Sequence, residues 1–100
     1  MDAVFRALAD PTRRQLLDSL YTRNGQTLNA LCERMDMTRQ AVTKHLHVLA
    51  DAGLVRHVKV GRERRWEFEP SQVEEARRSL EMIARQWDHA LGKLKMAVER

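Results

Sequence analysis

Residues 36–53 read DMTRQAVTKHLHVLADAG, and this stretch decides the fold. Thr38 is a residue type that caps helix N-termini, and Gly53 is the type that most readily ends a helix in a left-handed conformation. Apolar side chains recur between them at helical spacing, at Val42, Leu46 and Leu49. No acidic residue occurs from residue 38 to residue 50, although the chain holds 14 Asp and Glu. The stretch therefore predicts a helix with one side in a core and a basic, polar side exposed.

The polar side of this predicted helix carries long or hydrogen-bonding side chains, crowded into its N-terminal half. They are Thr38, Arg39, Gln40, Thr43, Lys44 and His47. In a helix-turn-helix, the second helix enters the major groove of DNA with its N-terminal residues against the bases. We expect Arg39 or Lys44 to contact guanine and Gln40 to contact adenine, because these side chains match the edges of those bases. Thr43 is expected at a thymine methyl group or a phosphate, and His47 at a phosphate.

The residues before this helix predict the rest of a helix-turn-helix. Thr27 is a typical N-cap for a short helix that residues 36–38 bring to an end. The apolar residues of that short helix are Leu28, Leu31 and Met35. Asp10-Pro11 predicts the start of an earlier helix that runs to about Tyr21, because Asp caps free N–H groups and proline fits the first helical position. Another short helix, over about residues 2–9, precedes it.

Downstream of these helices the hydrophobic pattern changes from a helical period to alternation. Residues 54–60 and 64–69 predict two strands joined by a tight turn at Gly61-Arg62-Glu63. Three arginines crowd the tip of this hairpin: Arg62, Arg64 and Arg65. Arginines on a protruding hairpin suit a wing that follows the minor groove or the phosphate backbone. Trp66 and Phe68 are expected to anchor the wing in the core.

The last segment, over about residues 71–98, predicts a long helix with a narrow apolar seam. Ser71 and Glu74 stand at the spacing of a capping box, and apolar residues then repeat in alternating steps of three and four. A helix of about 27 residues is about 40 Å long, more than a core of this size covers. We therefore expect this helix and the N-terminal helix to form a dimer interface with a second copy. The residues expected there are Val4, Phe5, Val73, Leu80, Ile83, Trp87, Leu91 and Leu94.

The positive charge of the chain is concentrated where DNA contact is expected. The formal net charge is +4 over 100 residues. Residues 38–65 hold seven Lys or Arg against two Asp or Glu, a net of +5, so the rest of the chain is nearly neutral. A local basic patch is typical of a protein that binds a polyanion, and equally of a solvated basic face.

Several classes of protein are excluded by what the sequence lacks. Cys32 is the only cysteine, which rules out an internal disulfide and favours a cytoplasmic location. No run of 18 apolar residues occurs, and the N-terminal residues lack the apolar stretch of a signal peptide. No Gly-rich phosphate loop and no His-Glu-x-x-His motif occurs. We therefore expect neither an enzyme nor a membrane protein.

Three blocks of the sequence resemble the ArsR/SmtB family of winged-helix repressors. They are Ala7–Arg14, Thr38–Leu46 and Leu49–Val55, and the resemblance runs from about residue 3 to the end. The resemblance implies a dimer built from the first and last helices. It also implies an imperfect palindromic operator near a promoter, and release of the DNA when a signal arrives.

The sequence departs from the metal-sensing members of this family. Thr27 and Asn29 stand where those members have a Cys-x-Cys pair, and Cys32 lies alone one turn later. Asp88 and His89 are adjacent, whereas the C-terminal metal site of other members needs them two residues apart. Because a soft metal needs several converging thiolates or imidazoles, we expect no metal site and no cofactor. The sequence identifies no effector.

These observations together predict one domain over residues 1–100, mainly α-helical with a small β-hairpin. The fold is a winged helix-turn-helix of about five helices plus a two-stranded wing. The predicted function is a sequence-specific regulator that binds double-stranded DNA, an autoregulating repressor that acts as a homodimer in the cytoplasm. The alternatives are a winged-helix module that binds protein or RNA, and a redox sensor that uses Cys32.

Overall fold

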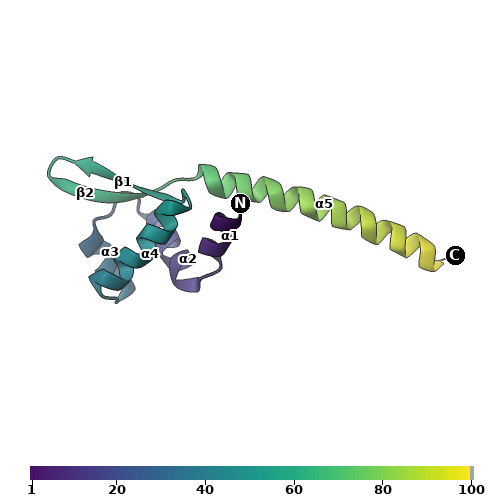
Figure 1. The fold of residues 1–100 in the computed structure, drawn as a ribbon, viewed down its shortest axis with the longest axis horizontal. Helices are drawn as coiled ribbons and strands as arrows, with labels where there is room; N and C mark the ends of the chain where they lie inside the picture. Colours follow the sequence, from purple (N-terminus) through teal and green to yellow (C-terminus); the bar gives the residue numbers. More distant parts are fainter. Residues whose placement is uncertain (100) are drawn as a thin grey trace.

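The computed structural model describes residues 1–99, which form five α-helices and one antiparallel pair of strands (Figure 1). In chain order they are α1 (Asp2–Leu8), α2 (Pro11–Thr22), α3 (Leu28–Met35), α4 (Arg39–Asp51), β1 (Val55–Val60), β2 (Glu63–Phe68) and α5 (Ser71–Glu99). Residues 1–69 form a head, from which α5 projects (Figure 1). The predicted winged helix-turn-helix architecture is confirmed.

The core of the head is made mainly of leucines. Its largest fully buried side chains are Leu16, Leu20, Leu31, Val42, Leu46, Leu49 and Leu54. Val42, Leu46 and Leu49 come from the apolar side of α4, as the helical spacing predicted. Burying one side chain of this size stabilises a fold by about 1.5–3 kcal/mol. This burial fixes the rotation of α4 about its own axis, and therefore fixes which side chains face outward.

Three helices begin at side-chain caps that the sequence predicted. Asp10 Oδ1 accepts from the backbone N–H groups of Thr12 and Arg13, at 2.8 and 3.2 Å. Thr27 Oγ1 accepts from Ala30 N at 3.2 Å, and Thr38 Oγ1 accepts from Ala41 N at 3.2 Å, in the same way. Each cap satisfies backbone donors that have no partner inside the helix, so α2, α3 and α4 start where local chemistry directs.

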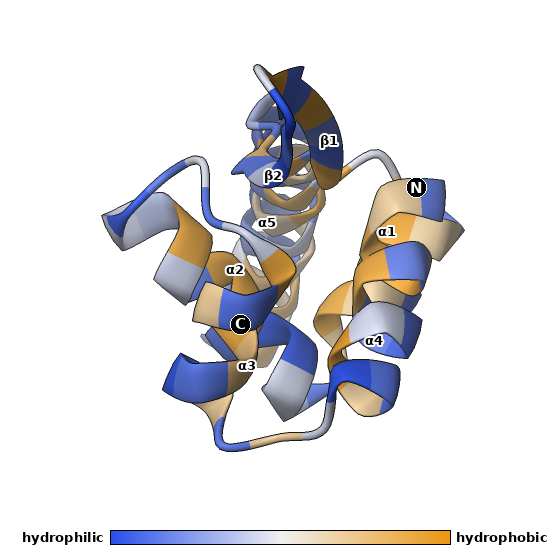
Figure 2. Cartoon of the chain, turned by 90° about the vertical axis from the view of Figure 1, so that its left-hand side faces the viewer, coloured by the Kyte–Doolittle hydropathy of each residue, from blue (hydrophilic) through white to orange (hydrophobic). Residues whose placement is uncertain are grey.

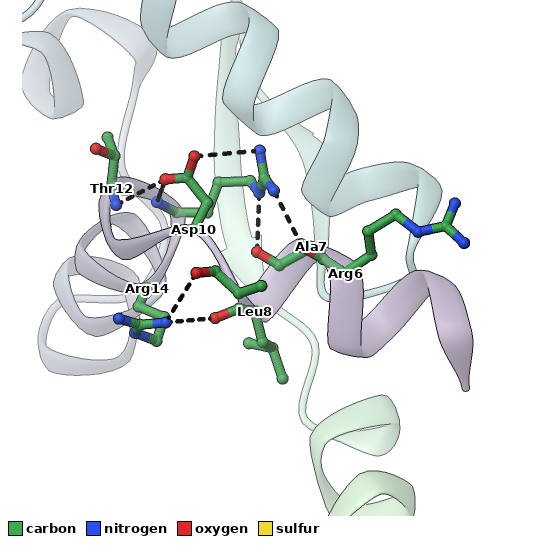
Figure 3. Close-up of polar contacts among 8 residues, drawn as sticks. Arg6, Ala7, Leu8, Asp10, Thr12 and Arg14 are labelled. Carbon is green, nitrogen blue, oxygen red and sulfur yellow. Dashed lines mark hydrogen bonds and ion pairs between the residues drawn. The ribbon is translucent and has the colours of Figure 1, made fainter.

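Two arginines of α2 hold the C-terminal end of α1 (Figure 3). Arg13 Nε donates to Ala7 O at 2.8 Å, and Arg14 Nη1 donates to Leu8 O at 2.8 Å. The Arg13 backbone N–H is the main reason that the pKa of Asp10 lies below its usual value, and the Arg13 charge adds to this. Because the last carbonyls of a helix lack partners inside it, these contacts dock α1 onto α2.

Helix α4 ends at Asp51, and the chain turns away from it at Gly53, whose φ is +75°. Gly53 N donates to Ala50 O and Leu54 N donates to Leu49 O, both at 2.9 Å. This pair of bonds is a Schellman motif, which requires a left-handed residue that glycine adopts without steric cost. A Cβ atom at Gly53 would also lie 3.1 Å from Gln72 Cγ. The predicted helix stop is therefore confirmed, and it directs the chain into the wing.

The wing pairs β1 with β2, with His57 opposite Trp66 and Val58 opposite Arg65. Figure 2 shows the alternation of hydrophobic and hydrophilic residues along β1. Trp66 faces the core and is 9% exposed, as predicted. Val58 and Val60 lie on the opposite face of the hairpin from Trp66, and Val60 is exposed.

The start of α5 differs from the predicted capping box. The helix begins at Ser71, and the Pro70 carbonyl accepts from Glu74 N at 3.0 Å, so Pro70 is the N-cap residue. Glu69 Oε1 accepts from Ser71 N at 3.2 Å, which lowers the pKa of Glu69. The carboxylate of Glu74 instead pairs with Arg77 one turn later. The prediction of a Ser71–Glu74 capping box is therefore wrong, because the helix starts one residue earlier than expected.

Helix α5 extends far beyond the head (Figure 1). It spans 29 residues, and Ala76 is its last buried side chain among residues 71–99. The described chain measures 68 × 24 × 21 Å with a radius of gyration of 18.4 Å. A compact domain of this length has a radius of gyration of about 13 Å. One chain therefore covers only the first turns of this helix.

Candidate nucleic-acid interface

The recognition helix α4 and the wing face one groove of about 600 Å³. Three side chains predicted to contact DNA line it from α4: Arg39, Thr43 and His47. Arg64 lines it from the wing, across from α4. Arg64 is 17 to 25 positions from these three residues in the sequence, and the fold brings them to one surface, as a helix-turn-helix with a wing requires.

The other predicted residues of α4 lie beside this groove rather than in it. Thr38, Gln40 and Lys44 are exposed, and none of them is among the residues that line the groove. Thr38 already uses its Oγ1 to cap α4. Gln40 and Lys44 are four residues apart and therefore form a second exposed row along the same helix.

The three wing arginines do not share one environment. Arg62 is exposed at the tip and Arg64 faces the groove. Arg65 lies on the other face of the hairpin, where Nη2 pairs with Glu63 Oε2 at 2.7 Å and Nη1 donates to Gly25 O at 3.0 Å. Because its guanidinium already has partners inside the chain, Arg65 holds the wing to the head, and we leave it out of the proposed DNA surface.

Two residues of the groove were missed by sequence reasoning. Asn29 of α3 accepts a hydrogen bond through Oδ1 from Arg39 Nη1, which ties the first residue of α4 to α3. His57 of β1 stacks edge-on against Trp66, with ring centroids 4.8 Å apart. The pairing of β1 with β2 sets His57 opposite Trp66 on one face of the hairpin, and the alternation along β1 did not indicate this. No local pattern indicated the contact between Asn29 and Arg39, because it crosses the turn of the helix-turn-helix.

Gln26, which is 4% exposed, was also missed. Its backbone pairs with Trp66 in both directions, with N–O distances of 3.0 and 2.7 Å. Its side-chain Nε2 donates to Ser19 O at 2.9 Å and to Arg23 O at 2.8 Å, at the end of α2. Gln26 therefore joins the base of the wing to α2, and so sets where the wing stands relative to α4.

The groove has a positive electrostatic balance. Arg39 and Arg64 line it, and Glu63 is its one acidic residue within the described part of the chain. Glu63 is already paired with Arg65. Because a groove lined by unpaired cations concentrates field lines, this surface suits a polyanion such as DNA.

Known proteins resemble this chain in both sequence and structure. A family model described as a helix-turn-helix domain matches residues 8–58. The uncharacterized helix-turn-helix-type transcriptional regulator YuzN of Bacillus subtilis is 49% identical in an alignment 69 residues long that covers 63% of this chain and 75% of YuzN. The structure of an ArsR-like transcriptional regulator from Rhodococcus sp. RHA1 is 40% identical, with a TM-score of 0.87 over 95% of this chain and 89% of that one. The chain belongs to the ArsR family of helix-turn-helix transcriptional regulators.

Two further relatives add to this comparison. The Bacillus subtilis transcriptional repressor SdpR is 33% identical over 55 residues, 55% of this chain and 60% of SdpR. A homodimeric winged helix-turn-helix domain from Mycobacterium bovis has the same fold, with a TM-score of 0.67, 22% identity and coverage of 85% and 78%. The family predicted from the three sequence blocks is therefore confirmed.

This ArsR-family chain has one cysteine, Cys32, which is half-buried against the core. Within residues 1–99, no three His, Cys, Asp or Glu side chains gather in a group able to hold a metal ion. No helix in the same range is both long enough and apolar enough to cross a membrane.

The ArsR-family chain has a second surface, along α5 and α1. The exposed large apolar residues of α5 include Leu80, Ile83, Trp87, Leu91 and Leu94. Phe5 and Val73 are half-buried where this row reaches the head, beside an open apolar groove of about 530 Å³. Val4 is 3% exposed and belongs to the core of its own chain. Because it has almost no surface left for a partner, we leave Val4 out of the proposed dimer interface.

Proposed function

We propose that this chain is a sequence-specific repressor that binds double-stranded DNA as a homodimer on an imperfect palindrome, its own promoter included. The observation that carries this proposal is the shared groove, in which Arg39, Thr43 and Arg64 meet. A helix held by its apolar side and a cationic wing across from it match the two grooves of a duplex.

The two parts of this surface have different proposed tasks. Arg39, Gln40, Thr43 and Lys44 read base edges in the major groove, where each base pair presents a distinct pattern of donors and acceptors. Arg62 and Arg64 contact the backbone or the minor groove, and His47 contacts a phosphate. Thr38 supports the helix end that points at the DNA, because its side chain caps α4.

Twofold symmetry follows from the exposed seam of α5. Two copies related by a twofold axis present two recognition helices, which read half-sites about 34–36 Å apart on one side of the duplex. The Mycobacterium bovis domain of the same fold is homodimeric, and SdpR is a transcriptional repressor, which supports both assignments. A repressor must reach its promoter, and we therefore propose that the chain acts in the cytoplasm.

The test measures the affinity of the purified protein for the DNA upstream of its own gene and for random duplex of equal length. Fluorescence anisotropy over a series of salt concentrations gives both affinity and salt slope. We expect Gln40→Ala to lose about 1–3 kcal/mol on the specific site and little on random duplex. Arg64→Ala weakens both duplexes alike and reduces the salt slope by about 1.

Arg85→Ala is the matched control, because it removes the same charge from an exposed position on α5, away from the groove. Its binding should equal that of the unmodified chain. Equal losses for Gln40→Ala and Arg64→Ala on both duplexes would contradict the division of tasks. Preference for single-stranded RNA over duplex would instead favour the RNA-binding alternative.

A further inference from the structure

One side-chain hydrogen bond joins the two helices of the helix-turn-helix at the surface. Asn29 Oδ1, near the start of α3, accepts from Nη1 of Arg39, the first residue of α4. Both side chains are exposed, and both line the groove of about 600 Å³ between α4 and the wing. The bond therefore restrains the guanidinium of Arg39 on the surface that we propose to meet DNA.

Arg39 occupies the end of α4 that the proposed docking puts against the bases. In a helix-turn-helix, the N-terminal residues of the second helix contact base edges. Thr38, immediately before Arg39, caps this end of the helix. Arginine commonly binds guanine through two parallel N–H groups, and that contact needs the plane of the guanidinium to lie along the base edge. The orientation of this one side chain thus bears directly on sequence preference.

The partner of Arg39 is neutral, unlike the partners of two arginines of the wing. Arg56 and Arg65 both pair with glutamates of the hairpin and its exit. An ion pair holds a guanidinium but also cancels its charge, which lowers its attraction for a polyanion. The amide oxygen of Asn29 takes one of the five N–H donors of a guanidinium and leaves the charge and the other donors free. Asn29 can therefore orient Arg39 without weakening its attraction for DNA.

The backbone of Asn29 is held in place independently of this bond. Thr27 Oγ1 caps the start of α3 by accepting from Ala30 N at 3.2 Å, and Leu31 anchors the same turn in the core at 0% exposure. The long side chain of an arginine has more rotamer freedom than the short side chain of an asparagine. Asn29 is therefore a fixed point against which the more flexible side chain is restrained.

We propose that Asn29 is a positioning residue for Arg39 and thereby sets the preference for guanine at one position of each half-site. This inference rests on the proposed DNA binding and names a residue through which its specificity arises. A free arginine side chain gives up rotamer freedom when it binds, which weakens the contact that it makes. Asn29 removes part of that cost in the free protein, so its effect appears only on a duplex that offers guanine to Arg39.

A double-mutant cycle tests this role on DNA. The unmodified chain, Asn29→Ala, Arg39→Ala and the double variant are each bound to a library of randomised duplexes, and the bound duplexes are sequenced. We expect Arg39→Ala to abolish the preference for guanine at one position, and Asn29→Ala to weaken it at the same position. On the duplex that the unmodified chain prefers, fluorescence anisotropy should show a loss of affinity of about threefold to tenfold for Asn29→Ala. In the Arg39→Ala background the same substitution should change the affinity by less than about twofold.

Two further variants separate orientation from charge. Asn29→Ala should leave the slope of affinity against salt concentration unchanged, because it removes no charge. Asn29→Asp puts a carboxylate beside the guanidinium, so it should weaken binding to every duplex and reduce that slope by about 1. Gln15→Ala is the matched control, because it removes an exposed amide from α2 at a position outside the groove. Its affinity and base preference should equal those of the unmodified chain.

The restraint on Arg39 can also be measured without DNA. Nitrogen relaxation of its Nε–H group by NMR reports side-chain motion on the ps–ns timescale. We expect the order parameter of this group to fall in Asn29→Ala. The Nε–H group of Arg13, which donates to Ala7 O at 2.8 Å, is the internal reference and should not change. The midpoint of urea unfolding should not fall, because an exposed contact of this kind adds little to stability.

Several results would overturn the proposal. Equal losses for Asn29→Ala in the presence and absence of Arg39 would show that Asn29 contacts DNA by itself. An unchanged order parameter together with a lower urea midpoint would show that the bond only stabilises the head. An unaltered guanine preference in Arg39→Ala would remove Arg39 from base reading. All of these results leave duplex binding by the unmodified chain intact, so they are distinguishable from failure of the proposed function, in which that chain binds no duplex.

Discussion

Helices α4 and α5 are both amphipathic, yet only one of them has its apolar side covered by its own chain. Val42, Leu46 and Leu49 of α4 are 0% exposed, whereas Leu80, Trp87 and Leu94 of α5 are 53%, 69% and 61% exposed. The two helices thus have the same kind of hydrophobic pattern with different consequences. The comparison teaches that a helical seam predicts burial but does not say which chain provides it.

This difference separates the head, whose core is buried by its own chain, from the outer part of α5, whose apolar side needs a partner to cover it. The head has a closed leucine core, capped helices and a wing anchored by Trp66. Residues 80–99, the outer two-thirds of α5, are all exposed in one chain, and isolated helices of that length are marginal in water. The stability of the head should therefore resist changes in α5, and the order of α5 should depend on association.

The largest expected effect is in the core of the head. Leu46→Ala leaves a cavity where α4 meets the other helices, so it should lower the free energy of unfolding by about 2–5 kcal/mol. Urea unfolding followed by circular dichroism gives this value. Met82→Ala, at an exposed position of α5, is the control and should change it by less than about 0.5 kcal/mol. A loss below about 1 kcal/mol for Leu46→Ala would show that α4 is less tightly packed than its burial indicates.

The next effect is on association and should leave the head intact. Trp87→Ala removes the central side chain of the exposed seam, and central aromatic residues of interfaces typically contribute about 2–4 kcal/mol. The dimer dissociation constant should therefore rise by about 30-fold to 1,000-fold. Sedimentation equilibrium measures it, and His89→Ala, on the opposite side of α5, is the control. An unchanged constant for Trp87→Ala would mean that the seam is not the dimer interface.

A smaller effect is expected at the start of α3. Thr27→Ala removes the side chain that accepts from Ala30 N, so the head should lose about 1 kcal/mol of stability while the dimer constant stays the same. Urea unfolding together with sedimentation separates the two quantities. Thr22→Ala is the control. Thr22 is the last residue of α2 and its hydroxyl donates to Asp18 O instead of capping a helix N-terminus, so its loss should lower the stability less. A change in the dimer constant would contradict the independence of the head and α5.

The smallest effect concerns the pH dependence of the head. The pKa of Asp10 lies below 3.8 in the folded chain, mainly because the Arg13 backbone N–H donates to its carboxylate. A lowered pKa contributes stability that is complete above 3.8 and is lost as the pH falls through the folded value. The difference in unfolding free energy between the unmodified chain and Asp10→Asn should therefore shrink from about pH 5 to about pH 2. If the difference in unfolding free energy stays constant over this range, Asp10 is not a cause of the pH dependence of the head's stability.

Features that depend on neighbours along the chain could be predicted from the sequence. The caps at Asp10, Thr27 and Thr38 and the stop at Gly53 each need only residues within a turn or two, so residue type and spacing indicated them. The capping box at Ser71 was the exception among these local features. There the side chain of Glu69, one residue before the N-cap Pro70, accepts from Ser71 N, and the carboxylate of Glu74 pairs with Arg77.

Part of the candidate DNA surface could not be predicted, because it depends on contacts between distant residues. Arg39 meets Asn29 across ten residues, and Arg65 meets Gly25 across 40. Residue type alone does not tell Arg62, Arg64 and Arg65 of the wing apart. The register of the hairpin puts Arg64 on the face of Trp66, toward the groove, and Arg65 on the other face, where Glu63 and Gly25 O are its partners.

The sequence by itself determined where α2, α3 and α4 start, where α4 stops, which side of α4 is apolar, and that the excess positive charge lies in residues 38–65. The tertiary structure alone decided which arginines are free, that Gln26 joins the wing to α2, and that the seam of α5 has no cover within its own chain. The physical reason is the distance along the chain over which each interaction acts. Caps, turns and periodicity act through bonds and contacts a few residues apart, whereas burial depends on how all elements share one core.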